Sequence, residues 1–470
     1  MAEPIHVAYC LDDGYAECTC VSMASMLANT KSNVHFHIIS SRLSDENKAK
    51  LSLLSERFPN MLLNFHEFTF DSKGFEVENS HLTVETYYRL YFPEILPDLE
   101  HILYLDGDTV INGDISELWN IDLGEHTVGV VADSYIQNLK ERNRAIDFSD
   151  DDLYFNAGVM LINLKKFEKY LFIQQILTII PELYRRLKEI NGCWNADQEL
   201  LNYRFNADKS ALFLPLQYNF IDNIIAIYEN QLSFHRDYYK LKDWALAYSN
   251  PVIIHYAGSK PFPLNGNIKY SYHWRLYYKY KAFTPFYDPL DEKLIAKYNH
   301  CEQLIKTDAF IMINFLRNAF ISINLSRSEF ISVNLDMRLY IRLYMQLFWQ
   351  DIFLNSAKHV KQIIGTRKLA YWGAGQHITH IMAIFASDGL YPDVVVDGLA
   401  SNYGKTVFEY TVQPAEMLRG KFDEYFVVLC METKQARDAV IKLLKEYGYN
   451  ENGFAHAYAE AYEREDKPLL

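Results

Sequence analysis

The chain has 470 residues, enough for two or three domains with sizeable hydrophobic cores. Hydrophobic residues make up 49% of the chain and charged residues 23%, a globular composition that excludes a disordered or collagen-like protein. The formal net charge is −14, from 60 acidic against 46 basic residues, which argues against a protein that binds nucleic acid.

The first 260 residues alternate strand-like and helix-like stretches. The apolar runs that predict buried strands lie at 5–10, 34–39, 62–66 and 101–105. Between them, 18–28 and 45–58 have the spacing of helices, and Ser44 is placed to cap the second. This alternation predicts an α/β fold in which helices cover both faces of a mostly parallel sheet. Ligands of such folds bind at the carboxyl ends of the strands.

A basic and aromatic segment follows at 269–286, where lysines and arginines interleave with tyrosine, tryptophan and phenylalanine. Two interpretations are open. The segment is either a helix that packs its aromatic side chains on the core, or a face that rests on an anionic membrane. In the second case each basic residue contributes about 1 kcal/mol of attraction.

Residues 313–342 repeat an aliphatic residue, an asparagine and an apolar residue every ten positions. This period does not follow a helical face, and it indicates either a short coil of stacked strands or chance similarity within a helical connector. We therefore divide the chain into a first α/β domain over 1–286, a helical or repeat-like connector over 287–364 and a Rossmann-like domain over 365–470.

The Rossmann-like domain is predicted from a second alternation of strands and a helix. Its expected strands are 369–372, 394–397 and 425–429. Gly373 and Gly375 follow the first strand as in a dinucleotide fingerprint, and Asp397 lies 22 residues beyond Gly375. Ile378 stands where the third glycine is expected, so a structural or nucleotide-sugar-sensing role fits this domain better than NAD chemistry.

Two carboxylates follow the strand at 101–105. Side chains alternate along an extended chain, so Asp106 and Asp108 lie on the same side of its end. Paired carboxylates suit a hard divalent cation that also binds diphosphate oxygens. The same spacing recurs at Asp150 and Asp152, in a polar loop where we expect only solvated charge.

A second buried strand ends at His255 and is followed by a glycine turn and Lys260. His255 would add a nitrogen to the oxygen ligands, and such a mixed set favours Mn²⁺ over Mg²⁺. Lys260 is a compact positive charge suited to a diphosphate leaving group. A lone histidine at a strand end is more often a hydrogen-bonded residue of the core, so the metal interpretation depends on the neighbouring motifs.

Two further polar motifs are Asn156-Ala157-Gly158, at the start of a strand, and Asp197-Gln198, at the start of a helix. Taken with the carboxylate pair and His255, in this order, they resemble glycosyltransferase family 8. The family includes bacterial lipopolysaccharide and lipooligosaccharide galactosyl- and glucosyltransferases. The resemblance covers residues 1–285 and also includes Asp-Asp-Gly-Tyr after the first strand and Thr-Tyr-Tyr-Arg-Leu at 86–90.

The resemblance implies a GT-A fold and a retaining transfer of galactose or glucose from a UDP-sugar. The acceptor would be a glycan or glycolipid of surface polysaccharide or lipopolysaccharide synthesis. Mn²⁺, with Mg²⁺ as the alternative, would be held by Asp106, Asp108 and His255. The donor would contact Asp12, Asp13, Tyr15, Arg89, Asp106, Gly107, Asp108, Asn156, Ala157, Gly258 and Lys260.

The resemblance also implies three catalytic residues. Asp133 and Asp197 would bind sugar hydroxyls, and Gln198 would lie on the face of the sugar opposite the leaving group. An amide at that place favours front-face substitution with retention over the two-carboxylate scheme of retaining hydrolases, although a double displacement stays open.

Two other functions stay open at this point. One is a nucleotide-sugar-binding scaffold with a decayed transferase site, suggested by Gly14 where lipooligosaccharide enzymes carry asparagine and by a His255 to Lys260 spacing one residue short. The other is an NAD-dependent oxidoreductase that acts through the C-terminal domain.

The cysteine content and the N-terminal residues allow the cellular compartment of the protein to be predicted. Six cysteines form neither a disulfide framework nor a zinc-type motif, which fits a reducing compartment. Residues 1–10 do not have the composition of a signal peptide, and no run of 18 apolar residues predicts a transmembrane helix. We expect a cytoplasmic protein, with peripheral contact at the cytoplasmic face of the membrane through 269–286.

Overall fold

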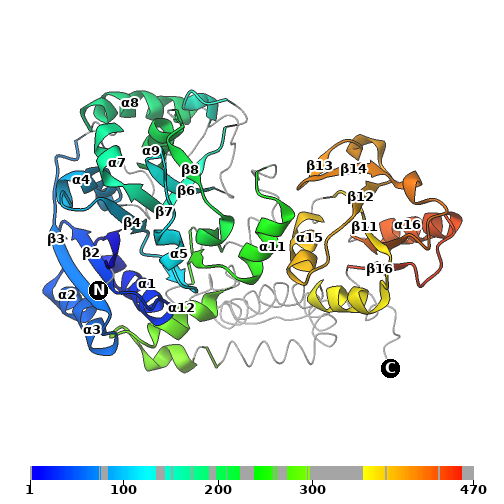
Figure 1. The fold of residues 1–470 in the computed structure, drawn as a ribbon, viewed down its shortest axis with the longest axis horizontal. Coiled ribbons are helices and arrows are strands. Elements are labelled where there is room, and N and C mark those ends of the chain that lie inside the picture. Colours follow the sequence, from blue (N-terminus) through cyan, green and yellow to red (C-terminus); the bar gives the residue numbers. More distant parts are fainter. Residues whose placement is uncertain are drawn as a thin grey trace, which may run out of the picture. The chain divides into compact units, whose positions relative to one another are not determined.

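The protein is described here from a computed structural model (Figure 1). The residues that the structure describes are 3–73, 75, 83–133, 143–149, 152–170, 173–189, 197–207, 209–222, 238–257, 260–261, 273–293, 295–296, 353–375, 378–431 and 434–457. The repeats at 313–342 and most of the predicted connector lie outside these residues.

The chain forms two compact units. The first comprises Met1–His235, Asn250–Pro263 and Tyr270–Asp288, and the second comprises Arg236–Ser249, Leu264–Lys269 and Pro289–Leu470. The sequence predicts boundaries near residues 286 and 364. The structure groups 236–249 with the C-terminal unit.

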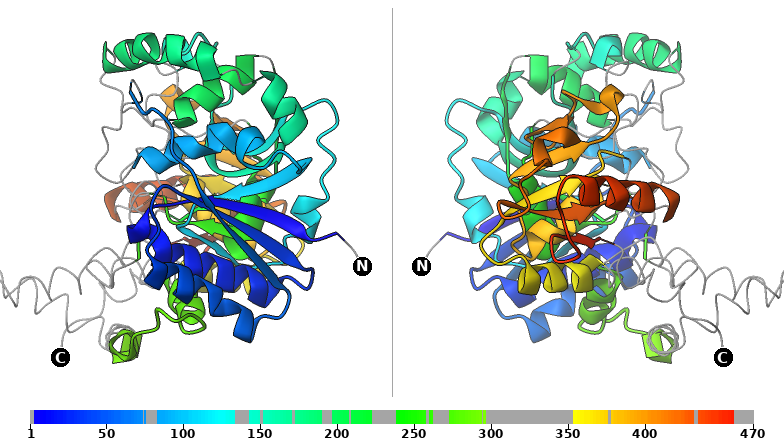
Figure 2. Two further views of the ribbon diagram at one scale, coloured as in Figure 1. Left: turned by 90° about the vertical axis from the view of Figure 1, so that its left-hand side faces the viewer. Right: turned by 90° about the vertical axis from the view of Figure 1, so that its right-hand side faces the viewer.

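A seven-stranded sheet forms the centre of the first unit, in the order β3-β2-β1-β4-β7-β6-β8 (Figures 1 and 2). Its strands are β1 Ile5–Cys10, β2 Val34–Ser40, β3 Met61–Glu67, β4 His101–Leu105, β6 Val128–Ala132, β7 Phe155–Asn163 and β8 Ala211–Phe213. β7 runs antiparallel to both of its neighbours, and the other pairs are parallel. The mixed, mostly parallel sheet confirms the predicted α/β fold.

The reversal between β4 and β7 determines which motifs meet. Because β7 is antiparallel to β4, its first residues lie beside the carboxyl end of β4, and Leu105 pairs with Val159. Asp106 N then donates to Gly158 O at 2.8 Å. The asparagine motif is therefore brought to the same sheet edge as the carboxylate pair.

Helices cover both faces of this sheet (Figure 1). One group is α1 Ala16–Asn29, α2 Asp45–Ser52, α3 Leu54–Arg57 and α12 Trp274–Lys281. The other is α4 Phe92–Ile95, α7 Leu164–Tyr170, α8 Ile173–Glu189 and α9 Asp197–Ala207. Ser44 Oγ accepts from Asn47 N at 3.3 Å, as a cap of α2, but the predicted helix over 45–58 is broken at Leu53.

Within the aromatic segment, α12 shows which of the two interpretations holds for residues 274–281. Trp274, Tyr277, Tyr278 and Tyr280 are all buried, so the helix packs these side chains on the core. They are not available at a membrane surface. No helix in the described ranges is long and apolar enough to cross a bilayer, and peripheral membrane contact stays a prediction.

Short elements complete the first unit. They are η1 Asp13–Tyr15, η2 Val84–Tyr91, α5 Ser116–Trp119, η3 Leu216–Tyr218, β5 Thr109–Ile111, β9 Phe220–Ile221 and β10 Ile253–His255. The last three strands form a separate small sheet in the order β5-β10-β9. β10 is antiparallel to β5, and His255 pairs with Thr109.

The second unit contains a six-stranded sheet in the order β13-β14-β12-β11-β15-β16. Its strands are β11 Lys368–Trp372, β12 Val394–Asp397, β13 Thr406–Val407, β14 Tyr410–Pro414, β15 Tyr425–Leu429 and β16 Phe454–His456. Apart from the antiparallel β13–β14 pair, all neighbours are parallel, as expected for a Rossmann-like unit. Its helices include α11 Leu241–Ser249, α15 Ile378–Ser387 and α16 Lys434–Glu446, with a further helix over 353–363.

α11 packs against α15 within this unit. The rings of Trp244 and Phe408 lie 6.5 Å apart, and Leu241 N donates to Glu409 Oε2 at 2.9 Å. These contacts explain why a segment placed between two strands of the first unit belongs to the second.

Asp397, at the end of β12, hydrogen-bonds to the backbone of the glycine loop that follows β11. Asp397 Oδ2 accepts from Ala374 N at 2.6 Å, and Oδ1 accepts from Leu399 N at 2.7 Å. In a dinucleotide site this carboxylate would bind a ribose. Here it bonds to backbone, which does not favour the oxidoreductase alternative.

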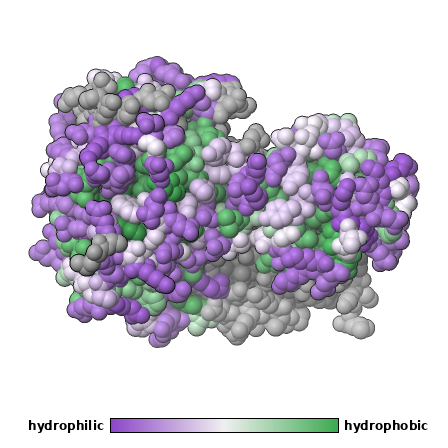
Figure 3. All heavy atoms as spheres, in the orientation of Figure 1, coloured by the Kyte–Doolittle hydropathy of each residue, from purple (hydrophilic) through white to green (hydrophobic). Residues whose placement is uncertain are grey.

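Hydrophilic residues cover most of the face shown in Figure 3. The exposed large hydrophobic side chains of the described residues are Leu53, Leu62, Tyr238, Leu246, Tyr287, Leu290, Tyr391 and Leu399. Single exposed side chains of this kind are ordinary on a protein surface and do not by themselves mark a binding face.

Candidate active site

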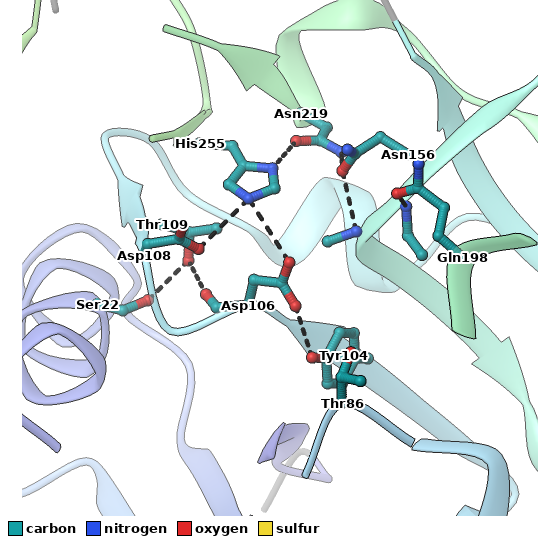
Figure 4. Close-up of polar contacts among 12 residues, drawn as sticks. Ser22, Thr86, Tyr104, Asp106, Asp108, Thr109, Asn156, Gln198, Asn219 and His255 are labelled. Atoms are coloured by element: carbon teal, nitrogen blue, oxygen red, sulfur yellow. Dashed lines mark hydrogen bonds and ion pairs between the residues drawn. The ribbon is translucent and has the colours of Figure 1, made fainter. Parts of the chain in front are cut away.

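The turn from β4 to β5 carries the two carboxylates. A Cβ on Gly107 would lie 2.5 Å from Thr19 Oγ1 of α1, so the turn needs glycine to pack this closely on the helix. Thr109 Oγ1 donates to Asp106 O at 2.9 Å and also lies 2.9 Å from Ser22 Oγ (Figure 4). These contacts fix the turn that carries Asp106 and Asp108 against α1.

His255 completes the carboxylate pair. Its Nε2 lies 3.3 Å from Asp108 Oδ1 and 3.6 Å from Asp106 Oδ2 (Figure 4). One ligand atom from each of the three residues lies within 4.8 Å of the others. His255 and Asp108 are buried, and Asp106 is partly exposed, so the group opens toward solvent on the Asp106 side.

Two asparagines fix the orientation of His255. Asn156 Oδ1 accepts from Gly158 N at 3.0 Å, which identifies that atom as an acceptor. Asn219 Nδ2 must then donate to it, at 2.9 Å, and Asn219 Oδ1 faces His255 Nδ1 at 3.0 Å. Nδ1 of the neutral ring therefore carries the proton, and the lone pair of Nε2 points at the carboxylates. Sequence reasoning missed Asn219.

Gly158 leaves room beside these ligands. A Cβ at this position would lie 2.3 Å from His255 Cε1 and 2.8 Å from Asp106 Oδ2. Two carboxylates with one oriented imidazole fit a divalent cation that accepts oxygen and nitrogen, and the glycine keeps their centre clear. The residues present thus fit a metal ion, although they do not select one.

Arg89 contacts three parts of the site. Its Nη2 lies 3.2 Å from Asp106 Oδ1, its Nη1 donates to Ala157 O at 2.7 Å, and its Nε lies 2.8 Å from Asp197 Oδ2. Thr86 Oγ1 donates to the other Asp197 oxygen at 2.5 Å. Asp197 is therefore buried against Arg89 and Thr86, and in this structure it holds the guanidinium in place.

Gln198 lies at the start of α9 beside the asparagine motif. Its Oε1 accepts from Ala157 N at 2.9 Å, and its Nε2 lies 3.4 Å from Asp133 Oδ2. Asp133 Oδ2 also accepts from Asn156 Nδ2 at 3.2 Å. The three predicted catalytic residues, Asp133, Asp197 and Gln198, thus lie in one hydrogen-bonded group with the metal-site residues. Figure 4 shows Gln198 beside Asn156.

Of the remaining predicted residues, Lys260 contacts this group directly. Lys260 forms an ion pair with Asp108, and its Nζ lies 5.5 Å from the centre of the Tyr15 ring. Asp12 Oδ1 caps η1 by accepting from Tyr15 N at 3.0 Å. Asp13 is exposed, and its Oδ1 accepts from Ser44 N at 2.8 Å. Gly258 lies outside the described residues.

Buried charges at the site perturb one another. Burial alone would raise the pKa of Asp108, but the positive charge of Lys260 holds it well below its usual range. Burial raises the pKa of Asp197 to about 6, against the opposing effect of Arg89. Burial would lower the pKa of Lys260, and Asp108 raises it above its ordinary value. Asp108 is therefore ionised at neutral pH, as a metal ligand must be.

Comparisons with known proteins agree with this geometry. A family model described as "Glycosyl transferase family 8" matches residues 6–262. General stress protein A of Bacillus subtilis is 26% identical over 304 residues, 60% of this chain and 94% of that protein. A lipopolysaccharide 1,2-glucosyltransferase of Escherichia coli is 28% identical over 308 residues, 64% of this chain and 85% of that protein.

A solved structure shares the fold. The galactosyltransferase LgtC, in complex with donor and acceptor sugar analogs, aligns with a TM-score of 0.50 at 23% identity, covering 62% of this chain and all of that one. The predicted GT-A fold is thereby confirmed.

Proposed function

The chain belongs to glycosyl transferase family 8, and we propose that it is a retaining transferase that moves galactose or glucose from a UDP-sugar to a glycan. The proposal rests mainly on one observation, the meeting of Asp106, Asp108 and an oriented His255 beside Lys260 and Arg89. A divalent metal, with Mn²⁺ preferred over Mg²⁺, would be held by the first three and would supply Lewis-acid stabilisation of the diphosphate.

Lys260 would assist the departure of UDP. It now pairs with Asp108, and the phosphate oxygens of a bound donor offer its ammonium group a second partner. A compact cation beside the leaving diphosphate stabilises negative charge as it develops, which lowers the barrier to bond cleavage. Arg89, already held against Asp106 and Asp197, supplies a second positive charge that needs no reorganisation.

Retention would follow from the nature of Gln198. An amide is a poor glycosyl nucleophile, so we propose that the acceptor hydroxyl attacks from the face that the diphosphate leaves. Gln198 Oε1 and the carboxylate of Asp133 would orient the sugar, since both belong to the group around Asn156 and Ala157. Asp197 would act through Arg89, because its oxygens contact Arg89 and Thr86.

The proposed sugar and acceptor come from the relatives. The names printed for two of them are lipopolysaccharide 1,2-glucosyltransferase and lipopolysaccharide 1,3-galactosyltransferase. We propose UDP-glucose and UDP-galactose as the donors to test first, and a surface glycan or glycolipid as the acceptor class. A decayed site is disfavoured, because the metal-binding trio and its orienting asparagines are all present.

The test is UDP release from a panel of UDP-sugars, with Mn²⁺, Mg²⁺ or EDTA. We expect slow hydrolysis of one donor with metal, and its loss in Asp106→Asn. Asp152→Asn is the matched control, because Asp152 belongs to the other Asp-x-Asp pair and accepts from Ser149 N in a loop.

Three outcomes are informative. Release that needs metal and Asp106 but not Asp152 supports the proposal and names the sugar. Binding of UDP with Mn²⁺ without release from any donor would favour the scaffold alternative. Neither release nor binding would overturn the proposed function.

A further inference from the structure

Four histidines share one face of the central sheet in the first unit. His6 lies on β1, His35 and His37 on β2, and His66 on β3. His6 pairs with His35 across the parallel strands, and residues two apart on a strand point to the same face. His6 and His35 lie at the amino ends of their strands, whereas the candidate active site lies beyond the carboxyl ends.

The rings are in close contact. The centroids of His35 and His37 are 4.4 Å apart, and those of His6 and His37 are 5.3 Å apart. His6 Nδ1 lies 3.0 Å from His37 Nε2, and His37 Nδ1 lies 3.1 Å from His66 Nε2. His35 Nε2 is buried and makes no hydrogen bond within the described part of the chain.

The distances between these nitrogen atoms are those expected of ligands that share one metal ion. One nitrogen each from His6, His35 and His37 lies within 4.8 Å of the other two. Two nitrogens bound to one tetrahedral zinc ion at 2.0–2.1 Å are about 3.3 Å apart, close to the observed separation between His6 and His37.

We propose that His6, His35 and His37 form a second metal site, which binds a borderline divalent cation such as Zn²⁺. Three imidazoles and no carboxylate differ in kind from the oxygen-rich set at Asp106 and Asp108, so the two sites would favour different metals. Two ligands two residues apart on one strand, with a third on the neighbouring strand, leave the fourth position of a tetrahedral ion to water.

The surroundings support this site. With Nδ1 of His37 as the donor to His66 Nε2, 3.1 Å away, His37 Nε2 is left for the metal and the ring is fixed, as outer partners of metal ligands do. His6 and His35 are only partly buried, so an ion can enter from solvent. A bound ion would join β1 to β2, and its role would be to stabilise the sheet rather than to take part in transfer.

The experiment isolates this site from the first. In the full-length Asp106→Asn/Asp108→Asn variant, Zn²⁺ is titrated against a competing chelator, and Co²⁺ is titrated while its visible absorption is recorded. We expect one equivalent of Zn²⁺ to bind, a tetrahedral Co²⁺ spectrum and a rise in Tm. Adding His35→Ala or His6→Ala should weaken Zn²⁺ binding at least about 100-fold, and His66→Gln about 10-fold.

His101→Ala is the matched control, because His101 is an exposed histidine on β4 of the same sheet. His35→Gln guards against a folding defect, and circular dichroism and the Tm without metal verify the fold of each variant. The proposal is overturned if the double variant binds no stoichiometric Zn²⁺, or if folded His35→Ala and His35→Gln bind it as tightly as the parent. Mn²⁺-dependent UDP release by His35→Ala is measured separately, so this result does not depend on the proposed function.

Discussion

At the scale of single residues, the candidate active site depends on glycines and amides as much as on its charges. Gly107 lets the carboxylate turn pack on α1, and Gly158 leaves the space in which the ligand atoms converge. Asn156 and Asn219 then decide which nitrogen of His255 carries its proton. None of these four residues binds a metal in our proposal, yet each determines where a ligand atom lies.

Gly158→Ala tests the space between the ligands. The new Cβ would lie 2.3 Å from His255 Cε1, so the ring or Asp106 must move. We expect metal-dependent UDP release to fall about 100-fold, because displacements of about 1 Å at a catalytic group have effects of that order. The control is Gly113→Ala, where the Cβ meets Val252 at an ordinary 3.4 Å. Equal activity of the two variants would contradict this account.

Asn219→Ala tests the orientation of His255. Removing the acceptor of the Nδ1 proton leaves the imidazole free to rotate or change tautomer, and we expect Mn²⁺ affinity to fall about 10- to 100-fold. Titration of Mn²⁺ followed by electron paramagnetic resonance measures this directly. Asn120→Ala, at an exposed asparagine, should leave the affinity unchanged. An unchanged affinity in Asn219→Ala would show that packing alone orients the ring.

The sequence predicts the proposed metal ligands of the site better than the residues that orient them. Asp106 and Asp108 follow a recognisable apolar strand, and His255 ends another. Asn219 is the single residue between η3 and β9, and nothing in its neighbours indicates a buried amide. Its role depends on where β10 and β7 meet in space, which local sequence does not specify.

At the scale of secondary structure, long apolar runs were predicted well and short elements poorly. The strands at 5–10 and 101–105 agree with β1 and β4 to the residue. The helix expected over 45–58 is instead two helices separated at Leu53. Strands of two or three residues, such as β8 and β9, are too short for any period to show, so pairing alone defines them.

Because of His456 on β16, we expect the stability of the second unit to fall at acid pH. Burial and the neighbouring Arg437 lower the pKa of His456 to about 4, below about 6.5 in an unfolded chain. The unfolded state therefore binds the proton first as the pH falls. The free energy of unfolding should therefore fall as the pH drops from 6.5 to 4. We expect a loss of about 2 kcal/mol, after allowing for the partial exposure of the ring.

Urea unfolding of the second unit at pH 7 and 4.5 measures this loss. His456→Gln is neutral throughout, so it should lose less stability on acidification than the parent. His359→Gln, at an exposed histidine of the same unit, should behave like the parent. The same loss in His456→Gln as in the parent would place the acid-sensitive group elsewhere.

At the scale of the whole molecule, the chain passes from the first unit to the second and back before it reaches His255. β9 and β10 belong to the first unit, whereas α11, which lies between them in the sequence, belongs to the second. A composition-based boundary cannot show this, because α11 is an ordinary amphipathic helix whose partner begins more than 100 residues later. Its packing on α15 and its contacts with Phe408 and Glu409 assign it.

A fragment that ends at Asp288 tests this assignment. Removing α15 exposes Leu241 and Trp244, side chains that are buried in the whole chain and whose burial contributes roughly 1.5–3 kcal/mol each. We expect the fragment to aggregate on size-exclusion chromatography. Replacing 236–249 with a glycine–serine linker should restore a monomer that still binds Mn²⁺. An unmodified fragment that is monomeric and stable would contradict this expectation.

The position of α11 also has a consequence for inheritance. A C-terminal unit that is joined only at one end can be exchanged between relatives by a single recombination event. Here the unit also includes a helix encoded within the catalytic region, six residues before a proposed metal ligand. A chimera made by one crossover would pair this helix with a foreign surface. The two units should therefore be inherited together, and compensating substitutions are expected on α11 and α15 when homologous chains are compared.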